Sequence, residues 1–161
     1  MGRWITWVVL GLFIVIVPFG SWYYLKKGLD YRKKSLSELV AKDSIATNLD
    51  SLHILRGFTS LIVTDTQPST TKVVGSILEQ FKNIKGFQIF YMDSLKGTRI
   101  MPAGYMADSF DKYTQQSFIL MDTAMHIRNV YRNDTESVRK MIEHIAMVIP
   151  RPKESDIKMK K

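Results

Sequence analysis

Apolar residues are concentrated first in one unbroken run near the N-terminus. Between Arg3 and Lys26 lie 22 residues without a charged side chain. At about 1.5 Å of rise per residue, a helix of this length spans roughly 33 Å, which is enough to cross the hydrocarbon core of a bilayer. Aromatic side chains cluster at both ends of the run, as they do at membrane interfaces: Trp4, Trp7, Trp22, Tyr23 and Tyr24. We therefore predict a transmembrane anchor over residues 1–25.

A cleaved signal peptide is the alternative for this run. It would be shorter and would end in small residues at the cleavage site, whereas aromatic residues stand there. The polar residues 26–51 that follow predict a linker with weak helical character around Leu36, Leu39 and Val40. We therefore expect the anchor to stay attached and to be joined by this linker to a folded domain.

The periodic patterns of a folded domain occupy residues 52–149. Residues 55–64 are rich in β-branched and apolar side chains and predict a strand. A polar loop at 65–70, with Pro68 near a helix start, leads to apolar residues at helical spacing. Gly86 ends this helix, and residues 86–93 predict a second strand. A strand, a helix and a strand in this order form a βαβ unit with two parallel strands.

The rest of the domain predicts a hairpin and a final helix. Residues 94–112 are irregular, with a short helix around 106–113. Residues 117–122 and 126–132 flank a short turn and predict a β-hairpin. Asn133 suits a helix N-cap, and Glu136 completes a capping box. The predicted fold class is therefore α/β: a transmembrane helix followed by a β-α-β-loop-β-β-α domain.

Charge and composition narrow the function classes. The net charge is +8, and much of the excess lies after the anchor and in the tail 150–161. We interpret both stretches as solvated flanks that contact anionic lipid headgroups. A nucleic-acid partner is not predicted, because no basic stripe interleaved with aromatic residues occurs in the folded region. The chain has no cysteine, which excludes disulfides, thiol nucleophiles, thiolate metal sites and lipoprotein attachment.

Three segments carry a resemblance to a known family: LIVTD at 61–65 before a Pro-containing loop, FQIFYMDS at 87–94, and the hairpin and helix at 118–145. With the N-terminal anchor and basic linker, this order resembles the Sco/SenC family, membrane-anchored proteins of cytochrome oxidase assembly with a thioredoxin-like fold. The resemblance covers roughly residues 50–149 and implies a minimal thioredoxin-like domain at 52–149.

The departures from that family concern its chemistry. The family places a CxxxC pair at the first strand–helix junction, where this chain has the cysteine-free loop 65–70. The copper-ligand histidine of the family corresponds to about Thr114, which cannot replace it. The resemblance therefore implies a degenerate member without the redox pair or the copper site.

Without cysteine, a copper site in this chain would have to use histidine and methionine ligands. His53, His126 and His144 share no HxH or HxxxH spacing, and we interpret them as structural or surface residues. Thioether ligands suit Cu(I), and the methionines of interest are Met101, Met106, Met121 and Met125. Core packing explains most methionines, so a Met/His copper carrier stands as the alternative rather than as the prediction.

Carboxylates and hydroxyls offer the remaining candidates. Asp65, Asp93 and Asp122 end predicted strands, the edge where ligands bind in open α/β sheets, although an aspartate there also caps turns. The hydroxyls of Ser69, Thr70 and Thr71 need an activating base, and the sequence places none nearby. Residues 133–135, Asn-Asp-Thr, match a glycosylation sequon that an N-cap explains more simply. We assign no catalytic, cofactor-binding or metal-ligating residue.

These patterns predict a membrane-anchored, non-catalytic interaction module, with a respiratory oxidase or its assembly machinery as the partner implied by resemblance. The alternatives are the copper carrier, a cytoplasm-facing membrane scaffold, and an enzyme acting through the strand-end aspartates. Five basic residues after the anchor favour a cytoplasmic domain, but the resemblance implies the outer side of the cell membrane. We expect the outer side, because lysines beside the anchor can snorkel at either interface.

Overall fold

A computed structural model describes residues 2–44, 54–91, 98–100, 110–113 and 115–150 of the 161-residue chain. The chain divides into two compact units, Met1–Glu38 and Leu39–Lys161. The first is a single helix and the second a mixed α/β domain, which confirms the predicted fold class at that level.

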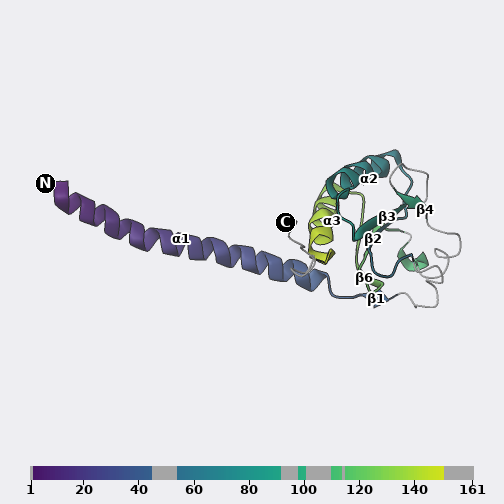
Figure 1. Ribbon diagram of the computed structural model, residues 1–161, viewed down its shortest axis with the longest axis horizontal. Helices are drawn as coiled ribbons and strands as arrows, with labels where there is room; N and C mark the ends of the chain where they lie inside the picture. The colour runs from purple at the N-terminus through teal and green to yellow at the C-terminus, as the bar shows by residue number, and fades with distance from the viewer. Residues whose placement is uncertain (1, 45–53, 92–97, 101–109, 114, 151–161) are drawn as a thin grey trace, which may run out of the picture. The chain divides into compact units, whose positions relative to one another are not determined.

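The helix α1 runs without interruption from Gly2 to Glu38 (Figure 1). An 18-residue stretch within its Trp7–Glu38 segment has a mean hydropathy of 2.0, so the helix is long and apolar enough to cross a membrane. The helix does not end at residue 25 but continues through the first half of the predicted linker. Good helix formers and the absence of proline between residues 26 and 38 explain the continuation.

The second unit is built on a six-stranded sheet with the order β1-β6-β5-β2-β3-β4. Its strands are β1 (Asp43–Ser44), β2 (Thr59–Val63), β3 (Phe87–Tyr91), β4 (Arg99–Ile100), β5 (Phe118–Met121) and β6 (His126–Tyr131). The strand β2 lies parallel to β3 and antiparallel to β5, and β5 and β6 form a hairpin. The predicted parallel pair and hairpin are therefore confirmed.

Two short strands were not predicted. The strand β1 lies in the expected linker and pairs antiparallel with β6, and Asp43 also contacts Lys112 and the hydroxyl of Tyr113. The strand β4 lies in the expected irregular region and pairs parallel with β3. Of the short helix predicted around 106–113, the described part is the 3-10 turn η2 (Asp111–Tyr113).

Two helices cover one face of the sheet, α2 (Pro68–Phe81) and α3 (Thr135–Val148). Proline occupies the first turn of α2, as predicted. The N-cap of α3 is Asp134, whose carboxylate accepts a hydrogen bond from the Ser137 amide at 2.9 Å, and not Asn133. The prediction was one residue early because the Asn133 side chain instead donates hydrogen bonds to Ser69 and Thr70.

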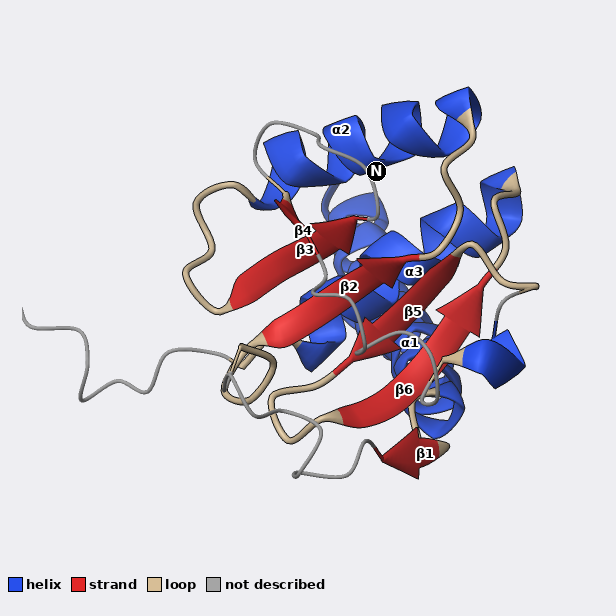
Figure 2. Cartoon of the chain, turned by 90° about the vertical axis from the view of Figure 1, so that its right-hand side faces the viewer, coloured by secondary structure: helices blue, strands red, loops and turns tan. Residues whose placement is uncertain are grey.

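The sheet separates two apolar cores. Figure 2 shows the sheet with α2 and α3 on one side of it. The helix-side core joins α2 and α3 to alternate residues of the strands and includes Leu61, Val74, Ile77, Leu120 and Ile145. The opposite core contains Leu55, Ile62, Phe90, Phe110 and Ile119. Leu39 is also buried in the helix-side core, so this core begins before the predicted boundary at residue 52.

Candidate functional site

A network of polar side chains joins the end of β2 to the starts of both helices. We call Asp65, Ser69, Thr70, Ser117 and Asn133 the strand-end cluster. The Asp65 carboxylate accepts hydrogen bonds from the Gln67 amide at 3.0 Å, from Thr70 Oγ1 at 2.9 Å and from Ser117 Oγ at 3.4 Å. Three donors therefore hold this carboxylate in place at the β2–α2 junction.

Asn133 connects the junction to α3. Its Nδ2 group donates to Ser69 Oγ at 2.9 Å and to Thr70 Oγ1 at 2.8 Å. Thr70 thus accepts a hydrogen bond from Asn133 while donating one to Asp65, and it has no exposed surface. Its hydroxyl cannot meet a substrate in this arrangement, although a carboxylate lies beside it.

The other hydroxyls of this region are also placed by partners. Thr71 Oγ1 lies 2.8 Å from the hydroxyl of Tyr91 at the end of β3. Ser69 is exposed, but its described partner is the amide of Asn133, which cannot serve as a base. The hydroxyls that the sequence offered as nucleophiles therefore hold loops together. The Asn133 amide, part of the sequon, does the same.

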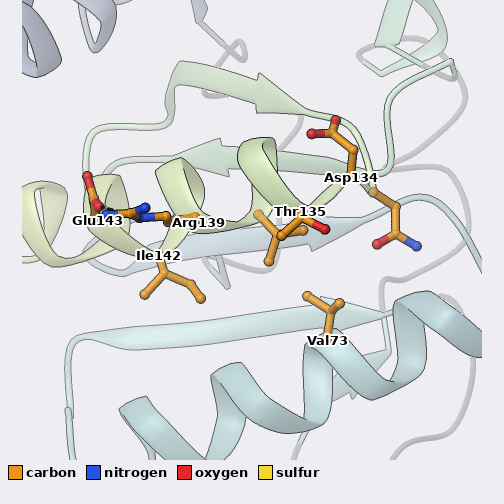
Figure 3. Close-up of a pocket in the computed structure, with 8 residues that line it drawn as sticks. Val73, Asp134, Thr135, Arg139, Ile142 and Glu143 are labelled. Carbon is orange, nitrogen blue, oxygen red and sulfur yellow. Dashed lines mark ion pairs between the residues drawn. The ribbon is translucent and has the colours of Figure 1, made fainter.

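A shallow groove of about 530 Å³ lies beside the strand-end cluster, between α2 and α3. Figure 3 shows Val73 of α2 and Ile142 of α3 pointing into it from opposite sides, with Arg139 and Glu143 paired at one end beside Ile142. Asp134 and Thr135 line the other end, next to Asn133. The groove therefore combines an apolar floor with charged ends, the chemistry that a protruding side chain of a partner would need.

The two described strand-end aspartates do not come together. The strand β5 runs antiparallel to β2, so Asp122 lies at the edge of the sheet opposite Asp65. The sequence suggested one shared edge, because it showed where each strand ends but not which way the strand runs. A site combining Asp65 and Asp122 is thus excluded by the direction of β5.

Asp122 organises the turn of the β5–β6 hairpin. The residue is 7% exposed, and its carboxylate accepts hydrogen bonds from the amides of Ala124 at 2.9 Å and His126 at 2.8 Å. Arg128 also contacts this carboxylate: its Nε donates to Asp122 Oδ2 at 2.8 Å, and its Nη2 lies 2.6 Å from the same oxygen. Burial raises the pKa of Asp122, but these hydrogen bonds outweigh it and hold the pKa below its usual value.

Arg128 reaches this carboxylate because of a bulge in β6. Leu120 pairs with Asn129 and Met121 pairs with Ile127, which leaves Arg128 as the extra residue. Its Nη1 group also donates to the Leu39 carbonyl at 3.2 Å. Arg128 therefore ties the start of the second unit to the hairpin. The strand pattern gave no signal of this role, because a bulge interrupts alternation.

The metal-ligand candidates that the structure describes are either buried in a core or in contact with another polar side chain. His144 is 2% exposed, and its Nδ1 lies 2.7 Å from the Tyr131 hydroxyl. His126 Nδ1 lies 3.4 Å from Asp122 Oδ2. Met121 and Met125 are buried in the core opposite the helices. The other metal-ligand candidates, His53, Met101 and Met106, lie outside the described residues, as do the strand-end Asp93 and Thr114.

Within the ranges that the structure describes, no group of three His, Asp or Glu side chains could hold a metal ion. In comparisons with known proteins, no protein-family model matches the chain and no curated protein matches it either.

The Asp122–Arg128 pair predicts a pH-dependent stability. The folded pKa of Asp122 lies below its unfolded value of about 3.9, so its contribution is full above that value and is lost as pH falls through the folded pKa. Asp122→Asn is expected to lower the free energy of unfolding by about 2 kcal/mol at pH 6, because Arg128 loses its carboxylate. Urea unfolding followed by circular dichroism should show this difference shrinking at pH 3.

The control for this experiment is Glu79→Gln, which removes an exposed carboxylate paired with Lys82 on α2. It is expected to change stability by no more than about 0.5 kcal/mol at either pH. An Asp122→Asn deficit of equal size at pH 6 and pH 3 would contradict the role given to the ionised carboxylate.

The strand-end cluster predicts a structural cost at Thr70. Thr70→Val removes a buried hydroxyl, leaving Asp65 without one donor and Asn133 without one acceptor. The expected loss is about 1–3 kcal/mol, measured by the same unfolding experiment. Ser69→Ala, at an exposed position of the same network, should cost about 0.5 kcal/mol or less. Equal stability of Thr70→Val and the parent would show that the network is not structural.

Proposed function

We propose that the chain is a membrane-anchored, non-catalytic interaction module with a thioredoxin-like domain. The observation that carries this proposal is the strand-end cluster, whose hydroxyls, amide and carboxylate bond to one another. A catalytic hydroxyl must be accessible and activated by a base, and Thr70 is inaccessible while Ser69 has no such base among its described partners. The geometry at this junction favours rigidity over chemistry.

The arrangement of the second unit supports the thioredoxin-like part of the proposal. A parallel β2-α2-β3 unit, an antiparallel β5–β6 hairpin and the closing helix α3 follow in the order that the resemblance implies. The strand-end cluster lies at the β2–α2 junction, where the Sco/SenC family carries its cysteines. A degenerate member would keep the scaffold and use this junction to hold α2 and α3 together.

The membrane part of the proposal is supported by α1, which has the length and hydropathy of a spanning helix. The proposed partner is a membrane protein, and by the Sco/SenC resemblance it is a respiratory oxidase or an assembly factor for one. Tethering the domain to the same membrane would raise its effective concentration near such a partner, so a shallow contact surface could suffice.

The groove between α2 and α3 is the proposed contact surface. Val73, Val138 and Ile142 are half-buried and form its apolar part. The groove is bordered by Asp134 at one end and by the Arg139–Glu143 pair at the other. A partner segment with an apolar side chain and a flanking basic group would match this surface.

Blocking the groove is expected to remove function without unfolding the domain. Val73→Arg places a long cationic side chain in the apolar part of the groove. In cells that carry this variant as the sole copy, the haem absorbance of assembled oxidase in membranes should fall at least about tenfold, as for loss of one interface anchor. Gln80→Arg adds the same charge at an exposed position of α2 and should leave the absorbance unchanged.

The outcomes of this experiment separate the alternatives. Equal oxidase levels in both variants, with normal amounts of the chain in membranes, would refute the groove as the contact surface. Restoration of oxidase by added copper in the Val73→Arg strain would favour the copper-carrier alternative, because an interaction defect is not corrected by the metal.

The proposed side of the membrane is tested by cysteine labelling. The chain has no native cysteine, so Gln80→Cys on the exposed surface of α2 introduces a unique thiol. We expect a membrane-impermeant maleimide to label this thiol in intact cells, because the domain is proposed to lie outside the cytoplasm. Labelling only after lysis would place the domain in the cytoplasm and favour the scaffold alternative.

A further inference from the structure

The continuity of α1 determines how the basic residues after the anchor are arranged. Successive residues of an α-helix are turned by about 100°, so residues seven apart lie nearly above one another. Lys26 and Lys33 form one such pair, and Lys27 and Lys34 form another. These four side chains, which we call the lysine face, occupy an arc of about 120°. All four are exposed, and Asp30 lies within the same arc.

The first tier of the lysine face is joined to aromatic residues. The ammonium of Lys26 lies 5.2 Å from the ring centroid of Trp22, and that of Lys27 lies 4.9 Å from that of Tyr23. Both are cation–π contacts between residues four apart. Aromatic rings of this kind sit at the headgroup level of a bilayer. The two ammoniums are therefore held toward the end of the apolar run.

The second tier lies about 10.5 Å farther along the helix, at Lys33 and Lys34. Side chains of an α-helix lean toward its N-terminus, and in α1 the apolar run is on that side. Both lysines therefore extend back toward the proposed membrane surface. The spacing between tiers is comparable with the Debye length of about 8 Å at physiological salt, so the second tier feels the charge of that surface.

We propose that the lysine face binds the phosphate groups of anionic phospholipids in the leaflet on the domain side. This inference rests on the proposed membrane anchoring of α1. Charge complementarity selects the occupant, since four cations and one anion share the face. A second copy of the helix packed on the same face would bring like charges together. Arg32 lies on the opposite side of the helix and takes no part.

Tryptophan quenching by brominated lipids tests the proposal in the full chain. With Trp4→Phe and Trp7→Phe, Trp22 is the sole tryptophan, next to the lysine face. The protein is reconstituted into phosphatidylcholine vesicles containing one quarter phosphatidylglycerol, with either lipid carrying bromine on its acyl chains. The two quenching curves give the relative association of each lipid with the surroundings of Trp22.

The expected result is a preference for phosphatidylglycerol of about fivefold, reduced by 0.5 M salt. Replacement of the four lysines by glutamine should bring the preference close to one. The pair Lys33→Gln and Lys34→Gln should leave an intermediate value, because the first tier remains. Arg32→Gln, which removes one charge from the other side of the helix, should leave the preference within the error of the parent.

Three results would overturn the proposal. Equal quenching by both lipids would show anchoring without headgroup selection. A loss in Arg32→Gln at least half as large as in the Lys33→Gln and Lys34→Gln pair would show a response to total charge rather than to the lysine face. Quenching that increases when the protein is diluted with lipid would show that a second copy covers the face. Absence of quenching by either lipid, with release of the chain by alkaline carbonate, would instead refute the membrane anchoring itself.

Discussion

The structure of the second unit depends on the burial of β2 on both of its faces. All five residues of this strand are buried, and its three apolar side chains, Leu61, Ile62 and Val63, alternate between the two cores. Leu61 packs toward α2 and α3, and Ile62 packs toward Leu55 and Phe110 on the other side. A strand in this position is stable only when both layers are present, so β2 depends both on the two helices and on the core that contains Phe110.

The same constraint explains why a hydrogen-bonded aspartate lies near each end of β2. Backbone and side-chain polar groups beside a doubly covered strand need internal partners, since water is excluded. Asp65 organises the β2–α2 junction at one edge, and Asp122 organises the β5–β6 turn at the other. Each carboxylate accepts hydrogen bonds from its own loop and also from a distant residue, Ser117 or Arg128. Both aspartates are therefore explained by folding.

The sequence predicted the elements whose residues carry a complete pattern. The helix α2 follows the spacing of Val74, Ile77 and Phe81, and β2 and β3 are short apolar runs bounded by polar residues. Such local signals are enough because each element buries its own face. The two-residue strands β1 and β4 carry no period, and they exist only through pairing with β6 and β3. Their pairing could not be read from the sequence.

The site was predictable in composition but not in geometry. Asp65, Ser69 and Thr70 stood out as polar residues at a strand end, yet Asn133, which donates to Ser69 and Thr70, is more than sixty positions away. That bond moves the α3 N-cap to Asp134. A capping pattern compares neighbours and cannot detect a competing partner from another part of the chain. Arg128 was missed for the same reason, since its bulge is defined by the register with β5.

In the proposed function, the polar residues that stand at the β2–α2 junction in place of a reactive thiol pair are the same residues that make the junction rigid. A thiol pair needs exposure and a lowered pKa to react, whereas Thr70 is fully buried between an amide and a carboxylate. Burying the hydroxyl lets Asn133 fix the start of α3 against the start of α2. The groove lined by Val73 and Ile142 depends on that fixed spacing. In this proposal, the junction that would serve catalysis in a thiol protein instead keeps the proposed contact surface in shape.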